Sequence, residues 1–218
     1  MMTLRTMEEL MAHAEFFALQ AMLATGTCRP CLFFTNAEGQ PGFFMHGNGE
    51  FNEAEKDGFV QMARMVTLAN AAIACVFISE IWVSVADVRP GESGPAAAAR
   101  IVKEKGMPSE DFERREMIMF AGESFDRRVC KVLPIVRSDN GKFFNFGESD
   151  VPMMDTAKGD QYDGRFAHIL TTRQPPPQVQ ELAKLFLKLN GLKPMKVAMP
   201  MEKSGGKPDK SRPIYPND

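Results

Sequence analysis

The chain has 218 residues, 44% of them apolar and 25% charged, with a formal net charge of −2. This size and composition predict one globular domain that buries a core without disulfides or metals. The slightly acidic balance gives no overall attraction to phosphate backbones, which argues against a dedicated nucleic-acid binder. No apolar run is long enough to span a membrane, and the N-terminus lacks the features of a signal peptide. We therefore expect a cytoplasmic protein whose four cysteines are reduced.

Two capping boxes predict the first two helices. Thr6 with Glu9, and Asn52 with Glu55, place a hydroxyl or amide three residues before a glutamate, which is a helix-start pattern. Apolar residues then recur every three or four positions. Between the helices, two apolar runs flank an Asn/Gly/Pro turn, which predicts a β-hairpin. The predicted elements are helices over 7–25 and 53–70, and strands over 31–35 and 42–46.

The second half of the chain predicts further strands and a last helix. The run 73–85 is rich in Val, Ile and Phe, and its apolar residues are continuous instead of alternating, which is typical of a strand covered on both faces. An alanine-rich helix over 95–105 follows it, and then an antiparallel meander whose second strand contains Pro134, suggesting an edge or a bulge. The pattern over 166–171 adds a short seventh strand. The remaining predicted elements are meander strands over 116–121, 129–136 and 142–146 and a helix over 178–190.

These elements predict an α+β fold. We expect a mainly antiparallel central sheet of about five to seven strands, packed by the N-terminal, second and C-terminal helices in the order α-ββ-α-βββ-α. Residues 1–191 form the domain, and the basic, Pro- and Gly-containing tail 192–218 is expected to be extended or disordered. The element order resembles profilin-like and roadblock-like modules. Because no motif supports this resemblance, it implies no function.

Two strand-like runs each carry a carboxylate at a position that would otherwise be core. Alternation along the first run places Glu80 on the same face as Trp82, and Glu116 begins the second run. A carboxylate among apolar side chains is costly unless it is paired or protonated. If the two strands are neighbours, Arg114 and Arg115 are the nearest cations. Burial would raise the pKa of Glu80 and an arginine would lower it, and the sequence does not decide between them.

The pattern E-x-W at Glu80 and Trp82, followed by P-x-x-D-x-x-R-x-E-M from Pro108 to Met117, resembles uncharacterised phage and bacterial proteins of similar size. The resemblance implies that these residues act as a unit, and it implies no activity. Two interpretations stay open. The cluster is an ion-pair network that fixes the register of the sheet, or it is a site with Glu80 and Glu116 as catalytic candidates and Trp82, Arg114 and Arg115 as binding residues.

Two further motifs are weaker candidates for chemistry. Cys28 and Cys31 form a C-x-x-C, but the pair follows a helix instead of opening one, so the helix dipole does not lower the thiol pKa as it does in thioredoxin-like sites. His46 ends a strand beside glycines, where it is a candidate general base, although no nucleophile elbow accompanies it. No phosphate-binding or dinucleotide motif is present, and we expect no cofactor.

Three functions follow from these observations. The first is a non-enzymatic binding, assembly or regulatory protein, encoded by a phage or mobile element, which meets a protein partner or a second copy through its amphipathic terminal helices. The second is a hydrolase or nuclease-like enzyme in which Glu80, Asp111 and Glu116 hold a divalent ion. The third is a nucleic-acid-binding accessory that uses the lysine-rich tail. The lack of a recognisable catalytic constellation favours the first.

Overall fold

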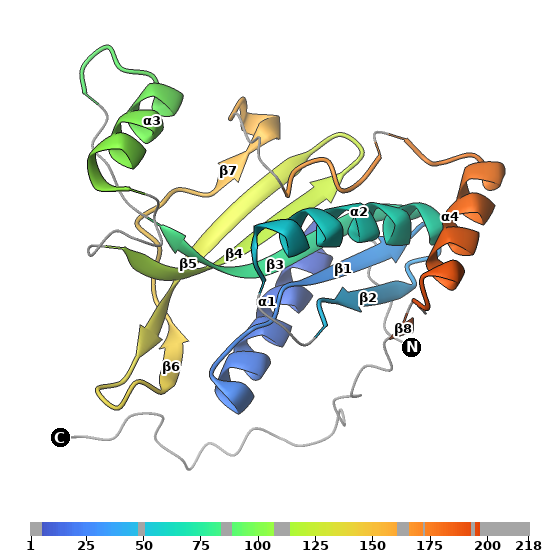
Figure 1. Cartoon of the computed structure of the whole chain (residues 1–218), viewed down its shortest axis with the longest axis horizontal. Helices are drawn as coiled ribbons and strands as arrows, with labels where there is room; N and C mark the ends of the chain where they lie inside the picture. Colours follow the sequence, from blue (N-terminus) through green and yellow to red (C-terminus); the bar gives the residue numbers. More distant parts are fainter. Residues whose placement is uncertain are drawn as a thin grey trace.

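The computed structural model describes residues 6–47, 51–83, 89–106, 114–160, 166–171, 173–192 and 195–196. Within these residues the chain forms an antiparallel sheet with helices on both faces, so the α+β prediction is confirmed (Figure 1). The helices are α1 (Met7–Thr25), α2 (Glu53–Ala69), α3 (Gly94–Lys105), α4 (Pro177–Leu189) and a 3-10 turn, η1 (Thr156–Lys158). The strands are β1 (Cys31–Asn36), β2 (Pro41–Met45), β3 (Ala72–Val83), β4 (Arg115–Ser124), β5 (Arg128–Arg137), β6 (Phe143–Phe146), β7 (Met154–Asp155) and β8 (Met195–Lys196).

The strand order is β6-β5-β4-β3-β1-β2-β8, and β7 pairs with β5. Every pairing is antiparallel. Strand β3 lies in the middle of the sheet, and its residues from Ala74 to Ser79 are buried on both faces. This confirms the prediction of a covered central strand. β3 and β4 are neighbours over ten residue pairs, from Ala74 opposite Ser124 to Val83 opposite Arg115.

Two apolar cores lie on opposite faces of the sheet, because side chains alternate along each strand. On one face, α1 packs through Leu10, Ala14 and Ala18 onto side chains that include Val76 and Phe120. On the other face, α2 and α4 pack together over a second set of side chains, among them Phe77, Cys75 and Ala121. The helix arrangement therefore matches the predicted packing by the N-terminal, second and C-terminal helices.

The predicted capping boxes set the starts of α1 and α2. The Thr6 hydroxyl accepts from the Glu9 amide at 3.1 Å, and the Asn52 side chain accepts from the Glu55 amide at 3.0 Å. Both glutamates reach back to the amide of the capping residue, which satisfies donors that helix starts leave open. Gly26 ends α1 with a left-handed φ of 77°, a conformation that a residue with a β-carbon adopts only at a cost.

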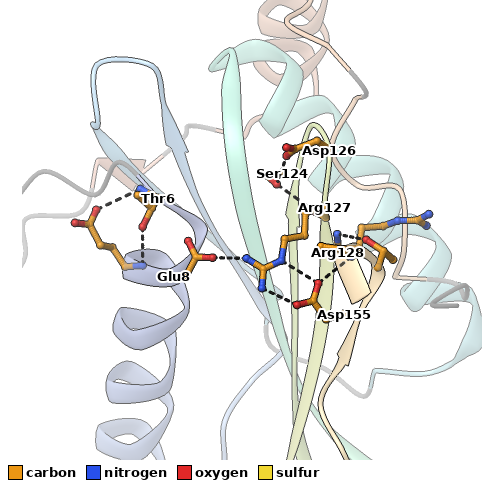
Figure 2. Close-up of polar contacts among 10 residues, drawn as sticks. Thr6, Glu8, Ser124, Asp126, Arg127, Arg128 and Asp155 are labelled. Carbon is orange, nitrogen blue, oxygen red and sulfur yellow. Dashed lines mark hydrogen bonds and ion pairs between the residues drawn. The ribbon is translucent and has the colours of Figure 1, made fainter. Parts of the chain in front are cut away.

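An arginine at the β4–β5 turn ties the start of α1 to strand β7. The Arg127 guanidinium donates to both oxygens of Asp155, at 2.9 and 2.7 Å, and to Glu8 on α1 (Figure 2). Asp155 also accepts from the Ala157 amide and so begins η1. The hydrogen bonds from Arg127 hold the pKa of the Asp155 carboxyl below its ordinary value. Because Asp155 is buried and paired in this way, it fixes the first residues after the β6–β7 connection.

Three predictions about the second half of the chain change. The segment 166–171 is irregular where it is described, and the short strand predicted there lies instead at β7. The strand that contains Pro134 is not an edge strand, but at Pro134 the side of β5 away from β4 has no strand pairing among the described residues. β7 pairs with 129–130 and β6 with 135–137, and the Pro134 carbonyl accepts from the Gly147 amide. Within the predicted tail, residues 195–196 form β8 against β2, while 193–194 and 197–218 lie outside the described residues.

Candidate functional sites

Glu80 and Glu116 lie on the same face of the sheet, above the end of α1. In the β3–β4 register Glu80 is opposite Ile118 and Trp82 is opposite Glu116, as the alternation of side chains predicts. Both oxygens of Glu116 accept from Arg137 of β5, one of them at 2.8 Å from Nε. Arg137 also donates to the Gly26 carbonyl at 3.2 Å. The guanidinium therefore joins β4 and β5 to the turn that ends α1.

Glu80 completes this cluster from the central strand. Its carboxylate accepts from the backbone amide of Cys28, which lies in the same turn as Gly26. Burial raises the pKa of Glu80; the Cys28 amide opposes this shift, the neighbouring Glu116 adds to it, and Arg137 opposes it. Desolvation thus outweighs the favourable contacts, which answers the question that the sequence left open. The cation that acts on Glu80 is Arg137, and not Arg114 or Arg115 as predicted.

The predicted binding residues lie at the outer end of the same strands. The Arg114 guanidinium stacks over the half-exposed Trp82 ring at 4.3 Å from its centre, a cation–π contact. Arg115 points to a different partner, Asp150, with which it forms an exposed ion pair. Asp111 and Pro108 lie outside the described residues. The pattern that resembles phage and bacterial proteins is therefore described only in part.

Both oxygens of Glu116 are bonded to Arg137, which limits what the Glu80–Glu116–Arg137 cluster can do chemically. A cation held by Glu116 would have to displace the Arg137 guanidinium from both carboxylate oxygens. Among the described residues, no three His, Cys, Asp or Glu side chains gather closely enough to hold a metal ion. The hydrogen bonds of Glu80, Glu116 and Arg137 join three strands to the end of α1. This geometry suits an ion-pair network that fixes the register of the sheet.

His46 lies in a shallow cleft of about 330 Å³ at the end of β2. Its Nε2 is 3.8 Å from a Glu55 carboxylate oxygen, and its ring contacts Phe51 and Phe59. No hydroxyl or thiol nucleophile lines the cleft in the part of the chain that the structure describes. The lining is otherwise mostly apolar: Phe44, Met45, Gly47, Gly58, Phe59, Met62, Asn190 and Leu192. His46 therefore has Glu55 as a carboxylate partner, but no nucleophile that it could activate as a general base lines the cleft among the described residues.

Cys28 and Cys31 are both buried, and the Cys28 thiol donates to the Arg29 carbonyl at 3.9 Å. Burial raises the pKa of the Cys31 thiol, and the neighbouring Cys28 raises it further. A thiol that holds its proton is a poor nucleophile and a poor metal ligand. The pair packs in the core beneath α1, in agreement with a structural role.

A third strand carboxylate, Glu123, was not among the predicted site residues. It is 2% exposed and accepts from the backbone amides of His168 and Leu170, the latter at 2.8 Å. Burial raises the pKa of Glu123 against the effect of these amides. The two amides that would form a strand ladder are bonded to this carboxylate, and His168 has a left-handed φ of 61°. These contacts explain why 166–171 is irregular.

The α4 outer face is an apolar surface that the rest of the described residues leave exposed. We use this name for five apolar residues that recur at spacings of three and four along the helix: Val179, Leu182, Leu185, Phe186 and Leu189. All five side chains are exposed, with 67% of Leu182 and 78% of Leu189 accessible to solvent. The helix packs against α2 through the neighbouring strip that contains Ala183 and Leu187. Figure 1 shows α4 at the periphery of the molecule, beyond the end of α2.

Comparison of the chain with protein-family models, curated proteins and solved structures found no match. None of the helices formed by the described residues combines the length and apolarity that crossing a membrane requires. The functional argument therefore rests on the geometry of the sites themselves.

Proposed function

We propose that this chain is a protein-assembly module that docks on another polypeptide through the α4 outer face. The observation that carries the proposal is the contiguous set of five large apolar side chains on one helix, left exposed to solvent while the neighbouring strip of the same helix is packed. Contiguous apolar patches of this kind on a folded chain mark interaction surfaces. Apolar residues at i, i+3, i+4 and i+7 are the pattern by which helices dock in protein complexes.

The energetic scale supports a specific contact. Fully burying a leucine or phenylalanine side chain is worth about 1.5–3 kcal/mol. Burial of the remaining exposed surface of five such residues offsets a substantial part of the roughly 4–15 kcal/mol cost of association. Glu181 and Lys188 lie on the flank of α4 beside Leu185 and supply polar residues for the rim that interfaces usually have.

Site-specific photo-crosslinking tests this proposal. A benzophenone amino acid replaces Leu189 in the full chain, expressed in the cells that naturally make it. Phe144 of β6, which is 71% exposed, is the matched control position. We expect a discrete crosslinked species from position 189, identified by mass spectrometry, that position 144 does not give. Equal labelling from both positions, or none from 189, would refute the proposed function.

A further inference from the structure

The spacing of the α4 outer face is that of a helix–helix seam. Val179, Leu182, Phe186 and Leu189 follow each other at intervals of three, four and three residues. In heptad notation these are successive a and d positions, the positions that form knobs in a two-helix interface. Leu185 widens the seam on one side, and the buried Ala183 and Leu187 lie on its other side. The α4 outer face therefore presents the a and d side chains that one helix contributes to a two-helix interface.

The same four residues are arranged symmetrically along the helix. Leu182 and Phe186 lie two positions on either side of Lys184, and Val179 and Leu189 lie five positions on either side. A second α4 running antiparallel, with a two-fold axis at the level of Lys184, places Leu182 opposite Phe186 and Val179 opposite Leu189. Each layer then matches an a position with a d position, as antiparallel helix pairs do. Such a surface is complementary to itself, as an isologous interface requires.

The charges bordering the seam select the same orientation. Glu181 and Lys188 lie on one flank of α4, near its start and its end, and Lys184 bonds to Glu181 at 2.8 Å away from the seam. In an antiparallel pair, Glu181 lies on the same flank and at the same level as Lys188 of the second copy. A parallel pair would place Glu181 and Lys188 of the two copies on opposite flanks, so that neither residue would lie beside its opposite charge. The antiparallel arrangement also opposes the helix dipoles favourably.

Resting on the proposed function, we propose that the partner on the α4 outer face is α4 of a second copy of this chain, packed antiparallel about a two-fold axis at Lys184. One helix per copy is a small interface beside the roughly 800 Å² per partner of standard stable complexes. We therefore expect a weak dimer, with a dissociation constant on the order of micromolar.

Cysteine crosslinking tests the orientation. Val179→Cys and Leu189→Cys are made separately in the full chain, one of them tagged, and the four native cysteines are buried and do not compete. Positions 179 and 189 are separated by about 15 Å along a helix, since the rise is about 1.5 Å per residue. A disulfide requires Cα atoms within about 7 Å. The antiparallel pair predicts a disulfide in the mixture of the two variants and none in Leu189→Cys alone.

Three results would overturn the inference. Crosslinking of Leu189→Cys with itself would show a parallel pair. A wild-type mass by light scattering equal to the 24.3 kDa chain at about 100 μM, well above the expected micromolar dissociation constant, would show that no dimer forms. A dimer that crosslinks at neither position would place the interface elsewhere. If position 189 photo-crosslinks a different protein while the chain is monomeric, the dimer is refuted and the proposed function stands.

Discussion

Leu187 and Leu189 lie two residues apart on α4, and truncation of each to alanine should have very different effects. Leu187 is 2% exposed in the core beneath α2, and Leu189 is 78% exposed on the α4 outer face. Removing a buried leucine loses its transfer free energy and leaves a cavity, so Leu187→Ala should lower the free energy of unfolding by about 2–5 kcal/mol. Leu189→Ala removes little buried surface, and its effect should stay within about 0.5 kcal/mol.

Urea unfolding measured by circular dichroism gives both values. The protein is diluted below about 1 μM, because pairing of α4 with a partner would otherwise add to the apparent stability of the wild type. The slope of unfolding free energy against urea should be the same for all three proteins, which shows that the variants unfold from the same compact state. Equal destabilisation by the two substitutions would mean that the α4 outer face is part of the core, and the reasoning would be refuted.

Three further predictions concern the polar contacts. Arg137→Met leaves Glu116 without its partner and should lower the free energy of unfolding, measured in urea melts, by about 1–2 kcal/mol. This estimate is lower than for a buried pair, because Glu116 and Arg137 are partly exposed to solvent. An unchanged urea midpoint would refute the role of the ion-pair network in stability. Because the pKa of Glu123 is raised in the folded protein, its contribution to stability is present below its ordinary value of 4.5 and is lost as pH rises through the folded pKa. The wild type should therefore gain stability relative to Glu123→Gln between pH 7 and pH 4.5, and parallel pH profiles would contradict this. Because the pKa of Asp155 is lowered in the folded protein, its contribution to stability is present above its ordinary value of 3.8 and is lost as pH falls. Asp155→Asn should therefore have a lower melting temperature than the wild type at pH 7, and the difference should shrink as pH falls below 3.8. An equal difference in melting temperature at both pH values would contradict the pairing with Arg127.

Local signals in the sequence predict much of the fold. The starts of α1 and α2 depend on capping boxes whose partners are three residues apart, so they can be read without knowing the fold. The central position of β3 follows from its continuous apolar run. Alternation along β3 and β4 likewise places Glu80 and Glu116 on one face once the two strands pair.

Contacts between distant segments are harder to predict. The partner of Glu116 is Arg137, which depends on the register of β4 with β5 and not on the nearby arginines. Strand β7 has only two residues and is set by Asp155 and Arg127. On α4, periodicity reveals an apolar stripe but does not tell which flank meets the body, and the small side chain of Ala183 allows close approach to α2 there. A stripe predicted from spacing alone can therefore face outward.

Sedimentation velocity over a dilution series tests the central claim most directly. The proteins compared are the wild type, Leu182→Lys on the α4 outer face, and Leu23→Lys on α1, whose leucine is 56% exposed above the opposite core. We predict the same monomer–dimer equilibrium for the wild type and Leu23→Lys, and at least about a tenfold weaker dimer for Leu182→Lys, equivalent to about 1.4 kcal/mol. Identical curves for all three proteins would contradict the claim that α4 of a second copy docks on the α4 outer face.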